Sequence, residues 1–163
     1  MKELIKTGFT VENAIQLATA AHEGQVDKSG IDYILHPLRV MNRLKGDSFQ
    51  IAAALHDVVE DTDITIDDLK KLKIGEIVID AIVLLTHPED YQGTKEEYFA
   101  NIQNIAESRN QIAIDVKFSD LIDNSDIKRI ENPTDKDFNR VKKYQKAMEI
   151  LKPFVSSYLL ENL

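Results

Sequence analysis

An apolar helical stretch that abruptly becomes charged is the feature that most constrains what this chain can fold into. Residues 51–55 read IAAAL, and one imidazole and three carboxylates follow at His56, Asp57, Glu60 and Asp61. Burying such charged groups costs several kcal/mol unless they are paired or bound to a metal ion. The fold must therefore bring partners to this segment, and a metal ion is the simplest explanation of why these residues occur together.

The length and the apolar content restrict the class of protein. A chain of 163 residues that is 43% hydrophobic predicts one domain, spanning residues 1–163, with a full hydrophobic core. No segment approaches the roughly 20 apolar residues of a membrane helix. The first residues, Met1 to Leu4, lack the apolar run of a signal peptide.

The charge and the cysteine content restrict the partners. The net charge of −8 argues against a nucleic-acid polymer. A phosphorylated small molecule stays compatible, because a bound cation can reverse the field inside one cleft. The absence of cysteine excludes disulfides and thiolate metal ligands and, together with the missing signal peptide, favours the cytoplasm.

Helical patterns dominate the chain, and no pair of alternating strands joined by a hairpin turn occurs. Thr10 precedes an apolar stripe at helical spacing, and capping boxes begin at Thr65 and Thr94. We expect helices over residues 11–21, 37–46, 48–59, after Thr65, over 75–85, after Thr94, over 110–125, and from 135 onward with an interruption near Pro153. Residues 75–85 would also suit a strand. The predicted fold class is all-α, a bundle of roughly eight helices with short connections.

Single residues predict three helix boundaries. Pro37 is expected at the first helical position, where its missing N–H costs nothing. Gly46 is expected to end that helix. Asp47 or Ser48 is expected to cap the next helix, which would run to about Val59.

A second helix carries a polar row through an apolar segment. In residues 110–125, Lys117, Asp120 and Asn124 are spaced three and four apart among apolar neighbours. The charged residues between positions 56 and 61 also form pairs four apart, which share a strip of helix surface. Two helices that each bring polar residues into a core are expected to face each other across a site.

The candidate metal ligands are two imidazoles and two carboxylates, namely His36, His56, Asp57 and Asp120. A set without sulfur suits Mn²⁺, Fe²⁺ or Zn²⁺ and does not select one of them. Such an ion can acidify water and neutralise phosphate charge. Glu60 and Asp61 could then take or give a proton, and the sequence does not decide between them. The alternative is a purely structural network of caps and salt bridges.

The remaining histidines do not form a second metal motif. His22 shares a helix face with alanines and is expected in the core. His87 precedes a proline in a loop and is expected at the surface. We therefore expect one metal ion.

Four segments, in this order along the chain, resemble motifs of the HD superfamily of metal-dependent phosphohydrolases. More narrowly, they resemble the hydrolase domain of RelA/SpoT enzymes and the single-domain small alarmone hydrolases of the metazoan SpoT homologue type. The segments are AHEGQ at 21–25, KSG at 28–30 leading to YILHP at 33–37, HDVVEDT at 56–62, and VKFSD at 116–120 with Asn124. A lone His-Asp pair would carry little information, whereas four segments in family order are specific.

The resemblance implies a fold, a cofactor and an activity. It implies an HD-domain helical bundle that binds one divalent metal ion, usually Mn²⁺. It implies hydrolysis of guanosine tetra- and pentaphosphate with release of pyrophosphate from the 3′ position. By position, it assigns the metal ligands to His36, His56, Asp57 and Asp120, the catalytic pair to Glu60 and Asp61, and substrate binding to Lys28, Ser29 and Asn124.

Two departures from the family pattern keep alternatives open. Asp27 stands where these hydrolases usually carry an arginine that packs on the guanine, and a carboxylate cannot replace a guanidinium. Residues 119–124 read SDLIDN where the family usually has ADRLHN, so that Arg and His are absent. The alternatives are an HD phosphohydrolase of another (deoxy)nucleotide and a nucleotide-binding sensor without turnover.

Overall fold

The computed structural model describes residues 8–161 and 163, and these residues form a helical bundle. The α-helices are α1 (Val11–Ala21), α2 (Leu35–Asn42), α3 (Asp47–Leu55), α4 (Val58–Asp61), α5 (Ile66–Lys71), α6 (Glu76–Leu85), α7 (Lys95–Glu107), α8 (Gln111–Asn124), α9 (Asp135–Leu151) and α10 (Ser157–Leu160). Two 3-10 turns, η1 (Ile127–Arg129) and η2 (Lys152–Phe154), lie on either side of α9. The predicted all-α fold is confirmed, and α6 settles the choice between helix and strand for residues 75–85.

Threonine side chains begin several of these helices. Thr10, Thr65 and Thr94 each accept a hydrogen bond from the backbone N–H three residues later, and the side chain at that later position accepts one in return. These reciprocal bonds satisfy N–H groups that have no partner within the helix. Thr134 begins α9 in a similar way, with its N–H 2.9 Å from Asp137 Oδ2.

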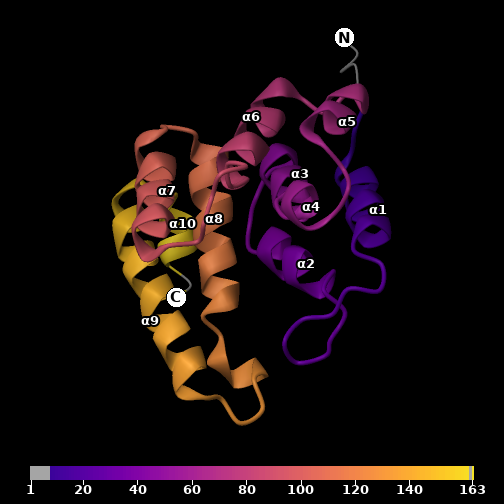
Figure 1. The fold of residues 1–163 in the computed structure, drawn as a ribbon. Coiled ribbons are helices and arrows are strands. Elements are labelled where there is room, and N and C mark those ends of the chain that lie inside the picture. The colour runs from indigo at the N-terminus through magenta and orange to yellow at the C-terminus, as the bar shows by residue number, and fades with distance from the viewer. Residues whose placement is uncertain (1–7, 162) are drawn as a thin grey trace.

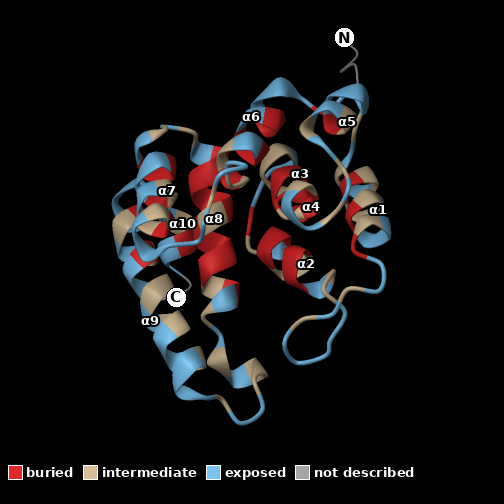
Figure 2. Ribbon diagram, in the orientation of Figure 1, coloured by how far each residue is buried: buried red, intermediate tan, exposed pale blue. Residues whose placement is uncertain are grey.

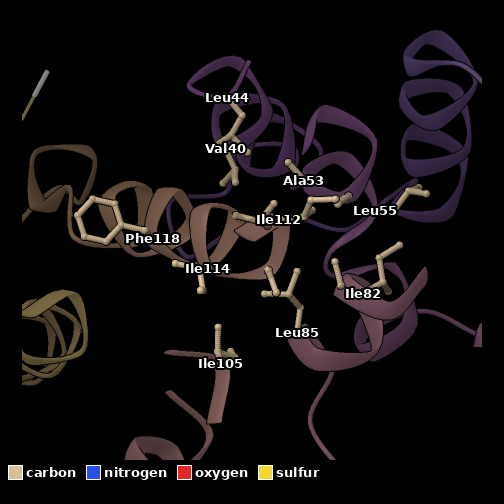
Figure 3. Close-up of a cluster of buried hydrophobic side chains, with 14 of the residues drawn as sticks. Val40, Leu44, Ala53, Leu55, Ile82, Leu85, Ile105, Ile112, Ile114 and Phe118 are labelled. Atoms are coloured by element: carbon tan, nitrogen blue, oxygen red, sulfur yellow. The ribbon is translucent and has the colours of Figure 1, made fainter. Parts of the chain in front are cut away.

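Helix α8 is the central element of the bundle (Figure 1). It packs against α2, α3 and α6, and also against α7 and α9. Figure 2 shows that most of its length is buried, and Figure 3 shows Ile112, Ile114 and Phe118 of this helix among core side chains from its neighbours. Burying each such side chain stabilises the fold by about 1.5–3 kcal/mol. Apolar contacts therefore hold α8 in place, and α8 is also the helix that carries the predicted polar row.

Helix α3 is buried at the centre of the N-terminal half. Ala52, Ala53, Ala54 and Leu55 have no exposed surface, and α1, α2, α6 and α8 pack against this helix. Small alanine side chains leave room for the neighbouring helices at normal packing density. His56 follows directly and is therefore carried into the interior, where 4% of it is exposed.

The helix expected to run to about Val59 is instead broken at the His-Asp pair. Helix α3 ends at Leu55, and Asp57, with φ −101° and ψ −6°, is the N-cap of α4. The carbonyl of Ala53 accepts both the backbone N–H of His56 (3.4 Å) and its ring Nδ1 (2.6 Å). This local bonding turns the chain, so residues 56 and 60 do not share one continuous helical strip.

The three helix boundaries predicted from single residues are also wrong. Helix α2 starts at Leu35, so Pro37 is its third residue, and the helix ends at Asn42. Proline is tolerated there because no first-turn N–H has an acceptor within the helix. Gly46, with φ 101°, is the N-cap of α3, and neither Asp47 nor Ser48 caps that helix.

In the described part of the chain, none of the helices is long and apolar enough to cross a membrane.

Candidate active site

The structure brings the four predicted metal ligands together from three parts of the fold. His36 lies on α2, His56 and Asp57 join α3 to α4, and Asp120 lies on α8. Nε2 of His36 is 3.1 Å from Asp120 Oδ1 and 3.6 Å from Asp57 Oδ2. Nε2 of His56 is 3.0 Å from Asp57 Oδ2 and 3.7 Å from Asp120 Oδ1. One ligand atom from each of His36, His56 and Asp57 lies within 4.8 Å of the other two, as a shared cation requires.

The two imidazoles are oriented by their other ring nitrogens. Nδ1 of His36 lies 2.8 Å from Asp123 Oδ2, and Nδ1 of His56 lies 2.6 Å from the carbonyl of Ala53. Both partners are acceptors, so each Nδ1 is the protonated donor, and in the neutral imidazole each Nε2 lone pair points toward the cluster.

These residues fit a divalent cation. Nε2 of His56 is buried and has no hydrogen-bond partner among the described residues, although two carboxylates lie within 4 Å. Nitrogen and oxygen atoms thus converge at separations that suit ligands about 2.0–2.2 Å from one ion. A His/Asp set of this kind can hold a divalent metal.

The electrostatics of the cluster favour positive charge. Burial alone would lower the pKa of His56, but Asp57 and Asp120 outweigh it and raise the pKa well above its usual value. Burial would raise the pKa of Asp57, but His56 lowers it to about 2. Tyr33 also donates its hydroxyl proton to Asp57 Oδ2 (2.6 Å). The carboxylates therefore stay ionised and provide the negative field that a cation needs.

The predicted polar row of α8 forms one bonded group. Lys117 Nζ lies 2.9 Å from Asp120 Oδ2, and Asn124 Nδ2 donates to Asp120 Oδ1 at 2.7 Å. Burial alone would lower the pKa of Lys117, but Asp120 outweighs it and raises the pKa. The lysine is thus engaged inside the site and fixes Asp120 in place.

The two predicted catalytic carboxylates differ in their surroundings. Glu60 Oε1 accepts the backbone N–H of His87 and lies 2.8 Å from His87 Nδ1. No described residue hydrogen-bonds to the Asp61 carboxylate, and burial, Asp57 and Glu60 raise its pKa. His87 lies in a loop, as expected, and its partly exposed ring pairs with Glu60 and stacks on Tyr91 at 3.9 Å.

A cavity of about 380 Å³ collects the predicted substrate-binding residues. Its lining includes Lys28, Ser29 and Asn124, together with Tyr33, Arg129, Arg140 and Tyr144. The motif comparison did not identify the two arginines, which lie outside the matched segments. A larger cavity of about 620 Å³, beside His87 between α6 and α7, contains none of the predicted ligands or substrate contacts. The smaller cavity therefore fits a phosphorylated ligand better.

The two departures from the family pattern have structural explanations. Asp27 Oδ1 accepts the backbone N–H groups of Ser29 (2.8 Å) and Ile31 (3.1 Å), and so closes the turn at the rim of the cavity. At the second departure, Asp123 stands where the family has a histidine. It is buried and contacts His36, as well as arginines from two elements. Asp123 was not predicted as a site residue, although a carboxylate on an otherwise apolar helix could have identified it.

Comparison with known proteins gives consistent sequence and fold relatives. No protein-family model matches the chain. It is 32% identical over 120 residues to the guanosine-3′,5′-bis(diphosphate) 3′-pyrophosphohydrolase of Aquifex aeolicus, covering 70% of this chain and 17% of that protein. It is 42% identical over 75 residues to the bifunctional (p)ppGpp synthase/hydrolase SpoT of Escherichia coli, covering 42% of this chain and 11% of SpoT.

A solved structure shares the fold. It is described as a metazoan ortholog of SpoT that hydrolyses ppGpp and plays a role in starvation responses. The TM-score is 0.77 at 24% identity, over 93% of this chain and 90% of that one. By contrast, the chain spans about a sixth or less of the curated relatives' length, so it corresponds to one segment of those longer proteins.

Proposed function

The chain belongs to the RelA/SpoT type of HD hydrolase domains, and from this membership we propose that it is a metal-dependent phosphohydrolase. Its proposed reaction removes pyrophosphate from the 3′ position of guanosine tetra- or pentaphosphate. One observation carries the proposal. The His/Asp cluster, in which Nε2 of His36 lies 3.1 Å from Asp120, shares Tyr33 and Asn124 with a cavity lined by basic side chains.

We propose that His36, His56, Asp57 and Asp120 hold one divalent ion, with Mn²⁺ as the physiological metal. The donor set of nitrogen and oxygen atoms supports this class of ion. When bound, the ion neutralises phosphate charge and lowers the pKa of water to a range useful for hydrolysis. The chain's own contribution is to fix both imidazoles through their Nδ1 atoms, so that the ligands need no rearrangement.

We propose that Glu60 and Asp61 are the proton-carrying pair, with Asp61 as the main carrier. The ring and the backbone of His87 hold Glu60. The Asp61 carboxylate has no such partner among the described residues, and its raised pKa brings it closer to neutrality. A general acid or base works best when its pKa lies near the working pH.

Binding of the nucleotide is assigned to the cavity of about 380 Å³. Lys28, Ser29 and Asn124 are the proposed contacts, and Arg129 and Arg140 add guanidinium groups that suit phosphate oxygens. The proposed ligand is a small phosphorylated nucleotide and not a nucleic-acid polymer, and the proposed location is the cytoplasm.

A second candidate function is hydrolysis of another nucleotide. Asp27 favours it, because its side chain is committed to the backbone turn and cannot pack on a guanine as an arginine does. Substituting Asp27 by arginine would remove these two bonds, so the turn and the specificity are linked.

A substrate panel tests both candidates. Purified protein with Mn²⁺ is incubated with guanosine tetra- and pentaphosphate and with nucleoside mono-, di- and triphosphates, and the products are separated by ion chromatography. The proposal expects pyrophosphate and GDP or GTP from the two guanosine substrates. Turnover of other nucleotides alone would establish the second candidate. Tight binding without any product would indicate a sensor.

A further inference from the structure

A buried carboxylate outside the predicted ligand set lies directly behind the metal cluster. Asp123 is on α8, and its side chain is 1% exposed. Its Oδ2 lies 2.8 Å from Nδ1 of His36, on the side of the ring opposite the cluster. Asp123 therefore contacts a candidate metal ligand without being one.

Three guanidinium groups surround the same carboxylate. Arg39 Nε lies 2.9 Å from Oδ1, Arg43 lies 3.2 Å from Oδ1, and Arg129 lies 3.1 Å from Oδ2. A carboxylate among such cations stays ionised and accepts hydrogen bonds strongly. Because Asp123 can only accept, the proton between it and His36 belongs to the imidazole.

The third arginine extends the network into the nucleotide cavity. Arg129 lies on η1 and lines the cavity that contains Lys28 and Ser29. Its carbonyl accepts a hydrogen bond of 2.7 Å from Ser29 Oγ. A continuous set of contacts thus runs from His36 through Asp123 and Arg129 to the loop at residues 27–30.

We propose that Asp123 is a positioning residue that fixes His36 for metal binding and holds Arg129 against the loop at residues 27–30. A carboxylate that accepts from the outer nitrogen of a metal-binding histidine fixes its tautomer and makes the inner nitrogen more basic. The first half of this role concerns metal affinity alone. The second half rests on the proposed function, because it concerns the nucleotide.

Calorimetry with Mn²⁺ tests the first half. Asp123→Asn is compared with Asp115→Asn, a buried aspartate of the same helix that bonds to Gln111 and Ser156 instead. Both variants should unfold at lower temperature, but only Asp123→Asn should bind Mn²⁺ more weakly, by about 10- to 100-fold. Unchanged Mn²⁺ affinity in folded Asp123→Asn, or equal losses in both variants, would overturn the proposal.

A measurement on the unaltered protein covers the case in which Asp123→Asn does not fold. Imidazole ¹⁵N spectra of the Zn²⁺-loaded protein should show the metal on Nε2 of His36 and a proton on Nδ1. That proton should be shifted downfield by the carboxylate and protected from solvent exchange. Metal on Nδ1, or rapid exchange of its proton, contradicts the proposed role.

Steady-state kinetics with guanosine tetraphosphate test the link to the nucleotide. Arg129→Met should raise KM by about tenfold or more, since one charged contact is lost, and should weaken Mn²⁺ binding far less than Asp123→Asn does. The exposed Arg109, outside both cavities, provides the matched Arg109→Met control. An unchanged KM in Arg129→Met overturns the link. Absence of turnover in the unaltered protein contradicts the proposed function instead, and the metal and imidazole tests still decide the role of Asp123.

Discussion

The two imidazoles of the cluster are fixed by partners of different strength. His36 donates to the ionised Asp123, whereas His56 donates to the carbonyl of Ala53. Nε2 of His56 is nevertheless the atom left buried without a hydrogen-bond partner among the described residues. Such an atom costs free energy unless something binds it, so a cation at this point would contribute to the stability of the fold as well as to chemistry.

Removal of one imidazole should therefore remove the response to metal. We expect Mn²⁺ to raise the melting temperature of the unaltered protein and to leave that of His56→Ala unchanged, because metal binding free energy adds to folding free energy. Scanning calorimetry with and without Mn²⁺ measures the difference. A full Mn²⁺ response in His56→Ala would rule out His56 as a ligand.

Neutral substitutions should separate the proton carriers from the ligands. Asp61→Asn should lower kcat by about 10²- to 10⁴-fold, as expected for loss of a general acid or base, with Mn²⁺ affinity unchanged. Glu60→Gln should have a smaller effect, since His87 already engages that carboxylate. Stopped assays of product release give both kcat values, and full activity of Asp61→Asn would exclude its assignment.

The connection between α6 and α7 positions Glu60 from outside the matched motifs. His87 contacts Glu60 through both its ring and its backbone, and its ring is stacked on Tyr91. His87→Ala keeps the backbone contact and loses the ring, so kcat should fall by about tenfold through misplacement of the carboxylate. Tyr91→Phe keeps the stacking surface and serves as the control. Equal activity of both variants would show that the ring does not position Glu60.

Helix α7 should depend on its first residue. The side chain and N–H of Thr94 both bond to Glu97 Oε2, at 3.1 and 3.0 Å, and the Glu97 N–H bonds back to Thr94. Thr94→Ala should cost about 1 kcal/mol of unfolding free energy, with no effect on metal binding. Urea denaturation measures the loss, and Thr94→Ser should retain most of the stability.

Local signals explain which elements could be predicted from the sequence. Caps such as Thr10 and Thr65 act within three residues, so the chain itself reveals them. The break before Asp57 could not be predicted, because the bond from the His56 ring to a carbonyl competes with a helix that the apolar pattern favours. Pro37 was misplaced because every position of the first turn tolerates proline.

At the scale of the whole fold, the site depends on contacts between segments far apart in the sequence. The four candidate metal ligands could be predicted because they lie in motifs that follow the family order along the chain. They come together only through the packing of α2, α3 and α8. Asp123, Arg129 and His87 were missed, because their roles arise from contacts across 87, 100 and 27 residues of sequence. Such pairings depend on how helices pack, which the periodicity of one segment does not determine.

The cluster makes the stability of the metal-free protein depend on pH in a definite direction. Burial opposes protonation of His36 and His56, but the neighbouring carboxylates raise both pKa values. Their stabilisation is therefore complete below the unfolded value of about 6.5 and is lost as pH rises through the folded values. Burial likewise opposes ionisation of Asp57 and Asp120, but their pKa values are lowered by His56 and by Lys117 respectively. Their stabilisation is present above about pH 3.9 and is lost as pH falls.

Metal-free protein should thus be most stable between about pH 4 and 6.5, and metal should change this profile. Raising the pH from 6 to 8.5 should lower the free energy of unfolding, measured by urea titration in EDTA. Mn²⁺ should cancel the decline, because it binds the deprotonated imidazoles and takes over the charge that the protons supplied. The increase in stability caused by Mn²⁺ must therefore grow with pH. A pH-independent increase would mean that the ion binds somewhere other than His36 and His56.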